Sequence, residues 1–173
     1  MAAIQKAFRT LFAWGSGISM ALVFGIIFVN SLRRYTIGKS LEWGEELPIY
    51  LTIYGVMFGL GYAYLQDRHI RFTVLTDFLT NRQRLILFAA SDVITAVVGV
   101  LLTRAGIVFA TRRGEIEASG LIGTAKDLAA ATGIDGFVAL GQMGTYQYAI
   151  AVGGAILAIA AVLRLISRLR EFR

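Results

Sequence analysis

Four long apolar runs constrain the fold of this chain more than any other feature. They lie near residues 12–32, 47–66, 84–110 and 143–166. An α-helix needs roughly 20 mainly apolar residues to cross the hydrocarbon core of a bilayer, and each run has about that length. Only 16% of the residues are charged, against about 25% in a typical soluble domain. The sequence therefore predicts an all-α integral membrane protein, a bundle of four transmembrane helices that forms a single membrane domain over residues 1–173.

The first apolar run is too long for an ordinary signal peptide. A signal peptide has about 7–15 apolar residues before a cleavage site of small residues. This run follows Lys6 and Arg9 and ends only at VNSLRRY, residues 29–35. We expect it to remain in the protein as the first span.

The basic residues at the ends of the spans predict the orientation. Four spans place both termini on one side of the membrane, and Lys and Arg are more numerous on that side. The positive-inside rule then places both termini in the cytoplasm. The cations on the terminal side are Lys6, Arg9, Arg68, Arg71, Arg82, Arg84, Arg164, Arg168, Arg170 and Arg173, and those on the other side are Arg33, Arg34, Lys39, Arg112, Arg113 and Lys126.

Several kinds of chemistry are disfavoured by composition. The net charge of +6 sits at span ends, where anionic lipid accounts for it, so we expect no nucleic-acid partner. The chain has no cysteine and a single histidine, His69, which argues against thiolate catalysis, a thiolate metal site and a bis-histidine haem. Little chain lies outside the spans. We expect no enzyme activity, no cofactor and no metal.

The segment SLEWGEELP, residues 40–48, is the most polar stretch near a span. Pro48 fits the first turn of a helix, where its missing N–H costs no hydrogen bond. Glu45 and Glu46 then lie just before the helix, near the positive end of its dipole. Their negative charges there stabilise the helix by roughly 0.3–1 kcal/mol each. Trp43 is a ring expected at headgroup depth. Adjacent carboxylates on a helix point about 100° apart, so Glu45 and Glu46 cannot share a proton. The start of the second span is the simpler explanation for both glutamates, and contact with a partner is the alternative.

Two ionisable residues, Asp92 and Arg104, interrupt the third apolar run. Twelve residues separate them, about 18 Å along a helix, so they do not pair with each other. Arg104 is near enough to the outer end to snorkel to the headgroups. We expect Asp92 to meet a basic or hydroxyl group on a neighbouring helix, with subunit docking and ion coupling as alternatives.

Small residues recur at helical spacing in the first two runs. Such stripes let helix backbones approach closely in lipid. Packing within this bundle is the simpler explanation, and contact with a separate subunit is the alternative. The stripes are Gly17, Ala21 and Gly25 in the first run and Gly55, Gly59 and Ala63 in the second.

Residues 111–142 form an outer connection that is neither a span nor plainly disordered. Its segment LIGTAKDLAAATG, residues 121–133, is compatible with a short helix lying in the outer interface. On the other side, QDRHIRF, residues 66–72, closes the second span, and its Arg68 and Arg71 suit a helix C-terminus near anionic lipid.

Several of these residues occur in an order that resembles one family. Asn30 is followed by Arg34 and Tyr35 after the first span, a "slxWxEEL" segment comes next, and a "GxxxAxxxxxHi" stretch runs through the second span. The chain thus resembles the small, Q-type membrane subunit of tripartite ATP-independent periplasmic (TRAP) transporters, best over residues 15–110. Thr73 stands where the family usually has Asp, and the 111–141 connection lacks the usual proline. The matching residues of the last two elements are Ser40, Leu41, Trp43, Glu45, Glu46, Leu47, Gly59, Ala63, His69 and Ile70.

The resemblance implies an accessory subunit in a bacterial inner membrane. Its partners would be a large permease subunit that moves an organic acid with a sodium gradient, a periplasmic binding protein that delivers the substrate, and membrane lipids. The small subunit would steady the permease and help dock the binding protein. The resemblance places subunit or docking contacts at Arg34, Tyr35, Trp43, Glu45 and Glu46 on the outer corner and at His69 and Arg71 on the inner one.

Two other functions remain open from the residues alone. A membrane anchor subunit of a respiratory complex also has few spans and a basic rim, although such anchors commonly need histidine haem ligands. A small homo-oligomeric channel would be expected to purify without a larger partner.

Overall fold

The computed structural model describes residues 2–66 and 79–171. Over these ranges the chain is helical, and four of its helices are long and apolar enough to cross a membrane. This confirms the predicted all-α membrane fold. The four long helices are α1 (Ala2–Ile37), α2 (Trp43–Leu65), α4 (Asn81–Arg113) and α6 (Met143–Glu171), with α5 (Ile122–Thr132) and the 3-10 helix η1 (Asp135–Gly141) between the last two.

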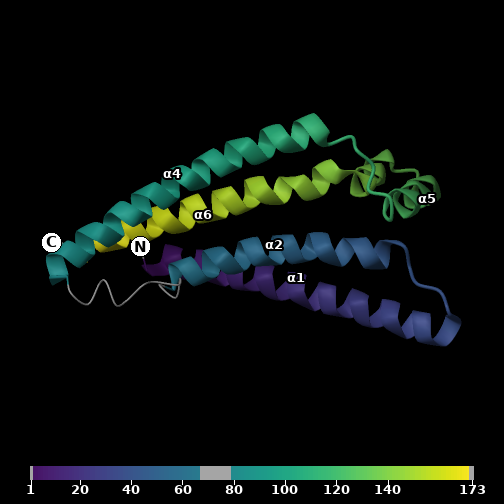
Figure 1. The fold of residues 1–173 in the computed structure, drawn as a ribbon, viewed down its shortest axis with the longest axis horizontal. Helices are drawn as coiled ribbons and strands as arrows, with labels where there is room; N and C mark the ends of the chain where they lie inside the picture. The colour runs from purple at the N-terminus through teal and green to yellow at the C-terminus, as the bar shows by residue number, and fades with distance from the viewer. Residues whose placement is uncertain (1, 67–78, 172–173) are drawn as a thin grey trace.

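The four long helices form two pairs that meet along one seam. Figure 1 shows α1 beside α2 and α4 beside α6, and α2 and α6 join the pairs. Both termini lie at one end of the bundle, called here the terminal end. The turn between α1 and α2 and the short helices α5 and η1 lie at the other, called the loop end (Figure 1). An even number of crossings therefore returns the chain to the side on which it began.

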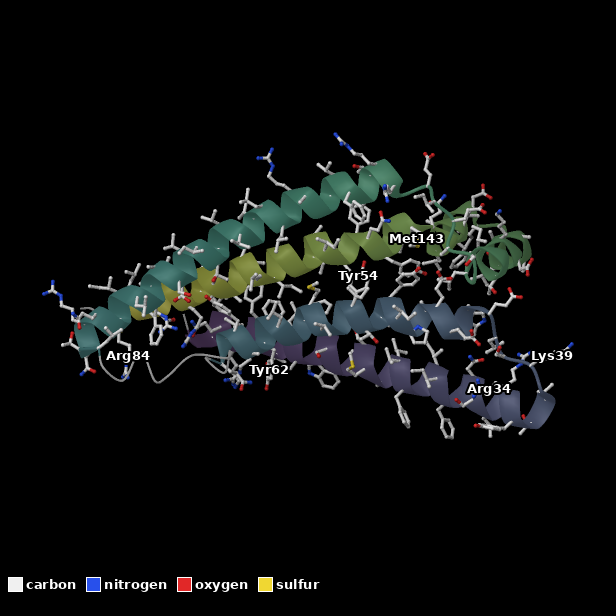
Figure 2. All side chains as sticks on the ribbon, in the orientation of Figure 1. Arg34, Lys39, Tyr54, Tyr62, Arg84 and Met143 are labelled. Carbon is white, nitrogen blue, oxygen red and sulfur yellow. The ribbon has the colours of Figure 1, made fainter. Side chains whose placement is uncertain are left out.

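The helices are longer than the hydrocarbon core, and their ends carry charge. The 36 residues of α1 make about 54 Å of helix, against a core about 30 Å thick. Figure 2 places Arg84 at the terminal end and Arg34 and Lys39 at the loop end. The helices therefore continue beyond the predicted apolar runs, and their end turns are polar enough to lie at headgroup depth.

Local signals fix where the helices begin and end. Thr80 and Gln83 form a capping box at the start of α4, with the Gln83 Oε1 atom 3.0 Å from the Thr80 N–H nitrogen that donates to it. At the end of α1, Gly38 has a φ of 76° and its N–H donates to the Arg34 carbonyl at 3.1 Å. Only glycine adopts this left-handed conformation without strain, so Gly38 stops α1 and turns the chain toward α2.

The position predicted for Pro48 is wrong. Because α2 begins at Trp43, Pro48 lies inside the helix instead of in its first turn. The helix starts early because the Asn30 Oδ1 atom on α1 accepts the Leu41 N–H at 2.7 Å and Gly44 packs directly against Asn30. Pro48 still costs little here, since the one intrahelical bond that it removes is to the carbonyl of Gly44, in the first turn.

Small residues bring the helix backbones together. A Cβ atom added to Gly99 would lie 2.6 Å from the Ala158 nitrogen of α6, and one added to Gly154 would lie 2.5 Å from the Thr103 nitrogen of α4. No side chain fits there. Between α1 and α2, a Cβ atom on Gly55 would lie 2.6 Å from the Met20 side chain. Close approach of this kind supplies dispersion contacts where lipid supplies no hydrophobic force.

The larger apolar side chains of the core gather toward the terminal end. Phe12 of α1, Leu65 of α2 and Ile156, Ala160 and Leu163 of α6 form one buried cluster. Most other large apolar side chains, above all on α1 and α4, are exposed. The bundle therefore buries one seam and leaves broad apolar faces outward.

We predict that Gly99→Leu destabilises the bundle. The new side chain would meet α6 backbone, and overpacking of this kind costs typically 1–3 kcal/mol. The thermal unfolding midpoint of the purified chain in detergent should fall. Gly17→Leu is the matched control, because nothing lies within 4 Å of a Cβ atom added there. Equal midpoints for the two variants would contradict the tight contact between α4 and α6.

Candidate functional site

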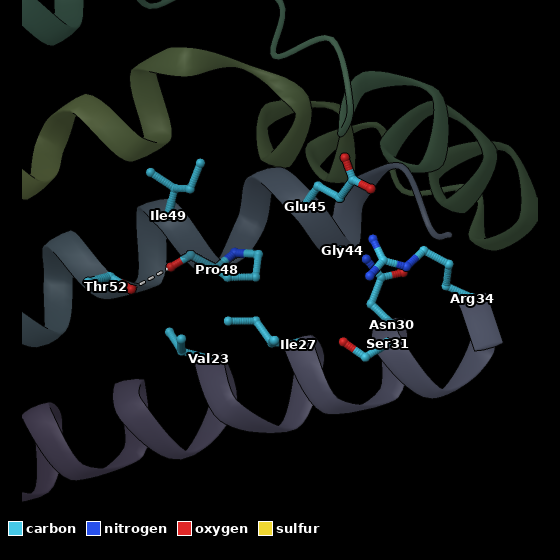
Figure 3. A pocket seen from close by; sticks show the side chains of 10 residues that line it. All are labelled: Val23, Ile27, Asn30, Ser31, Arg34, Gly44, Glu45, Pro48, Ile49 and Thr52. Atoms are coloured by element: carbon cyan, nitrogen blue, oxygen red, sulfur yellow. Dashed lines mark hydrogen bonds between the residues drawn. The ribbon is translucent and has the colours of Figure 1, made fainter. Parts of the chain in front are cut away.

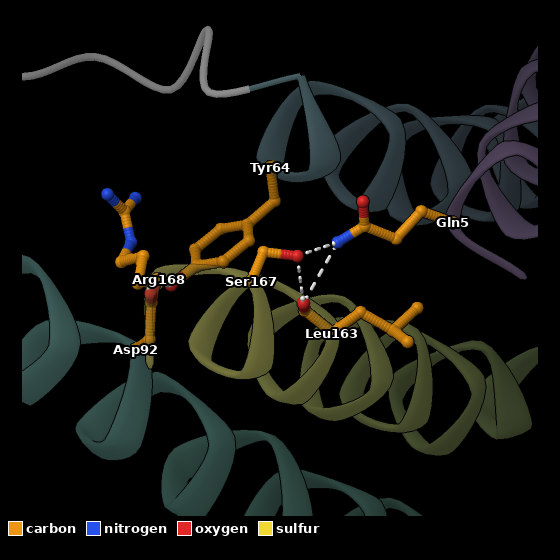
Figure 4. A network of polar contacts seen from close by, with 6 residues as sticks. All are labelled: Gln5, Tyr64, Asp92, Leu163, Ser167 and Arg168. Atoms are coloured by element: carbon orange, nitrogen blue, oxygen red, sulfur yellow. Dashed lines mark hydrogen bonds and ion pairs between the residues drawn. The ribbon is translucent and has the colours of Figure 1, made fainter. Parts of the chain in front are cut away.

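A polar cluster at the terminal end ties all four long helices together. The Arg168 Nε atom of α6 lies 2.6 Å from Oδ2 of Asp92 on α4, and the Tyr64 hydroxyl of α2 donates to Asp92 Oδ1 at 2.7 Å. On α1, Gln5 Nε2 donates to the Leu163 carbonyl at 2.9 Å and to the Ser167 hydroxyl at 2.5 Å. Figure 4 shows these side chains converging on α6 from three helices.

The charges in this cluster are withdrawn from solvent. Asp92 is 3% exposed and Arg168 is 6% exposed, and the Arg168 guanidinium lies 4.9 Å from the Phe88 ring centroid. An ion in an apolar setting costs several kcal/mol unless it is paired and hydrogen-bonded. Asp92 has both kinds of partner, an arginine and a tyrosine hydroxyl. The cluster therefore holds helices together and, within these contacts, leaves no carboxylate oxygen without a donor.

A second cluster holds the outer connection against α2 at the loop end. Glu46 Oε2 accepts the Gly120 N–H at 2.8 Å, and Glu46 Oε1 accepts the Tyr50 hydroxyl at 2.7 Å. The Tyr50 ring stacks on Tyr146 of α6, with centroids 4.1 Å apart. The Tyr54 hydroxyl donates to the backbone of α6 as well. One carboxylate thus joins α2 to the segment before α5, far away in sequence.

The outer connection is an ordered structure. Ala118 N–H donates to the Gly141 carbonyl at 2.8 Å, and Met143 N–H donates to the Ile116 carbonyl at 2.8 Å. These bonds bring the two ends of the connection side by side, with α5 and η1 between them. The short helix predicted near residues 121–133 is present as α5.

A cleft of about 490 Å³ opens between α1 and α2 toward the loop end. Figure 3 shows α1 and α2 on its two sides, with Arg34 and Glu45 at the loop-end rim. Its deeper part is apolar. The lining residues are Val23, Ile27, Asn30, Ser31, Arg34, Gly44, Glu45, Pro48, Ile49 and Thr52.

The residues predicted for the outer corner separate into two groups. Glu46 is engaged inside the chain, as described above. Arg34, Tyr35 and Glu45 are exposed, with Tyr35 at 81%, and Trp43 is half-buried beside them. The guanidinium of Arg34 lies 5.6 Å from the Tyr35 ring centroid. The two adjacent glutamates therefore have different surroundings, one facing the connection and one the cleft.

The remaining predicted residues lie elsewhere. His69 and Arg71 fall outside the described residues. Arg104 is exposed on an apolar face of α4. Gly55 and Gly59 pack against α1 and Ala63 is half-buried, whereas nothing lies within 4 Å of Cβ atoms added to Gly17 or Gly25. The stripe of the second run thus faces the bundle, and that of the first run faces outward.

Sequence reasoning missed the residues that complete the two clusters. Tyr64, Arg168 and Gln5 at the terminal end, and Gly120 and Tyr146 at the loop end, carry no distinctive pattern. Arg168 looks like an ordinary basic residue at the end of a span. The one available signal was the four-residue spacing of Glu46 and Tyr50, which places their side chains on one helix face.

The four apolar helices and the two polar clusters together define a multi-pass membrane protein whose helices are joined by polar contacts. Residues 23–171 match the family described as "Tripartite ATP-independent periplasmic transporters, DctQ component". The chain belongs to this family, which confirms the resemblance in the sequence and makes the chain a transporter component. That family is not an enzyme family.

One curated relative matches part of the chain. Over 77 residues the chain is 34% identical to the sialic acid TRAP transporter permease protein SiaT of Haemophilus influenzae (strain 86-028NP). The matched segment is 44% of this chain and 12% of that protein. The chain thus spans a small part of the length of this relative.

We predict that Asp92→Asn destabilises the chain strongly. The substitution removes the charge opposite Arg168, and breaking a buried ion pair typically costs about 3–5 kcal/mol. The free energy of unfolding in detergent or bicelles measures the effect. Asp127→Asn on α5 is the control, because the Asp127 side chain is exposed. An equal loss for both variants would mean that the Asp92 carboxylate is solvated in the folded chain.

We predict that Glu46→Lys loosens the outer connection. A hydrogen bond to a charged group contributes about 1.5–3 kcal/mol, so the Gly120 amide should exchange with solvent at least about tenfold faster. Hydrogen–deuterium exchange followed by mass spectrometry over residues 114–121 measures this. Glu45→Lys is the adjacent control and should leave that segment unchanged. The contact is refuted if both variants exchange alike.

Proposed function

We propose that this chain is the small membrane subunit of a sodium-driven, binding-protein-dependent transporter that imports an organic acid. The match of residues 23–171 to the DctQ component is the observation that carries this proposal. It favours a transporter subunit over the membrane anchor of a respiratory complex and over a homo-oligomeric channel. The match to a sialic acid permease protein agrees with an acidic substrate.

In this proposal the chain acts as a scaffold for a large permease subunit. The polar clusters at both ends give the four helices a fixed arrangement, and the glycine contacts bring their backbones close. At the same time α1 presents the small residues Gly17, Ala21 and Gly25 outward. Small residues on an outward helix face allow another helix to approach closely. We therefore assign this face of α1 to the large subunit.

The loop end is the side that we assign to the periplasm. The positive-inside rule favours the termini in the cytoplasm of a bacterial inner membrane. The ordered connection of residues 111–142, held by Glu46, then lies on the periplasmic side. Exposed groups there, Glu42 and Tyr35 among them, offer a polar surface against which a substrate-binding protein can dock.

We predict that Gly17→Leu weakens assembly without weakening the chain itself. A leucine there would hold a partner helix away, so less large permease should co-purify with the tagged small subunit. Sodium-dependent uptake of organic acids into cells should fall in parallel. The matched control is Ala105→Leu, on the exposed face of α4.

The uptake measurement also tests the function itself. Deleting the chain should abolish sodium-dependent uptake of at least one carboxylate- or sulfonate-bearing substrate, and the wild-type chain should restore it. Unchanged uptake in the deletion strain for every such acid would contradict the proposed function. Equal assembly of the Gly17→Leu and Ala105→Leu variants would contradict only the contact assigned to α1.

A further inference from the structure

The cleft between α1 and α2 changes from apolar to charged along its length. On α1 it is lined by Val23, Ile27, Asn30, Ser31 and Arg34, which follow one another at helical spacing on one face. The change from valine to arginine takes eleven residues, about 16 Å of helix. The cleft thus presents hydrocarbon-like surface toward the middle of the two helices and hydrogen-bonding groups at its loop-end rim. A lipid molecule changes from apolar to polar along its length in the same way.

The rim lies at the depth of lipid headgroups. Arg9 and Arg33, near the two ends of α1, are 24 positions apart, about 36 Å along the helix. A hydrocarbon core is about 30 Å thick. Arg34 therefore emerges at the level of phosphate groups. An arginine there presents several N–H donors in a fixed fork that suits a phosphate.

The rim carries charge of both signs. Glu45 of α2 lines the cleft together with Arg34 of α1. Within the described residues neither side chain forms an ion pair in this chain; the Arg34 guanidinium stacks only on Tyr35. Pro48 has no N–H, which leaves the carbonyl of Gly44, another lining residue, without the usual helical donor. One cation and one anion therefore remain available to a ligand, close to a backbone carbonyl that lacks its usual helical donor.

The size of the cleft favours a lipid over a protein segment. A helix with its side chains is about 10–12 Å wide, so a single turn of 5.4 Å already fills roughly 400–600 Å³. The cleft of about 490 Å³ would hold only about one turn of a helix. Its volume lies within the range of small-molecule sites, roughly 300–1,000 Å³.

We propose that this cleft binds one phospholipid with a zwitterionic headgroup of the phosphatidylethanolamine type. The phosphate pairs with Arg34 and the ammonium group with Glu45. The first part of an acyl chain lies against Val23, Ile27 and Ile49. A purely anionic headgroup could also pair with Arg34. It has no cationic group to pair with the Glu45 carboxylate, which would repel it. This inference rests on the cleft and is independent of the transported substrate.

Native mass spectrometry tests the proposal on the full chain as extracted in mild detergent with the subunits that accompany it. Phosphatidylethanolamine and phosphatidylglycerol with identical acyl chains are the probes. The wild type should bind one phosphatidylethanolamine more tightly than phosphatidylglycerol. Arg34→Gln should weaken both lipids about tenfold, and Glu45→Gln should weaken only phosphatidylethanolamine, by a similar factor. Arg33→Gln, next to the cleft but outside its lining, is the control and should change neither.

Three results would overturn the proposal. The first is equal binding of the two lipids by the wild type, and the second is binding by Arg34→Gln that equals the Arg33→Gln control. The third comes from a photo-reactive benzophenone side chain placed at Ile49 in living cells. Cross-linking to phospholipid is the expected product. Cross-linking to a protein instead would identify the cleft as a subunit contact.

Discussion

Lipid gives helices no hydrophobic reason to associate, and the structure of this chain follows from that constraint. Helices in a bilayer are held by close packing and by polar contacts between them. Here Gly99 and Gly154 let α4 and α6 approach to backbone contact. The buried pair of Asp92 and Arg168 then fixes the register of these two helices, because a carboxylate displaced from its arginine would be left in an apolar setting.

The same contacts give the bundle the fixed arrangement that the proposed scaffold role requires. Polar clusters fasten the bundle at both ends, and Glu46 extends the loop-end cluster to the connection of residues 111–142. The seam between the helix pairs is buried, while α1 and α4 keep exposed apolar faces. A stable bundle with open faces suits a subunit whose work is to support a neighbour. The exposed face of α1, which we assign to a permease helix, and the cleft, which we assign to a lipid, lie on different faces of α1.

The sequence predicted the elements better than their contacts. Hydropathy alone located the four membrane helices, because span length is set by bilayer thickness. It also singled out Asp92 and the two glutamates, since charge is rare in such a chain. It misplaced Pro48, because the helix start depends on Asn30, fourteen residues before Gly44. The partners of Asp92 and Glu46 depend on which helices lie side by side, and no local pattern encodes that.

The most direct test of this account is the composition of the complex that the chain forms in its own membrane. The chain is tagged at its natural locus and extracted in mild detergent. Native mass spectrometry then measures the mass of the complex and identifies the proteins that co-purify. We expect stoichiometric amounts of one large, many-span permease subunit. A monomer, or a homo-oligomer of this chain with no larger membrane protein, would contradict the role of the bundle as a supporting subunit.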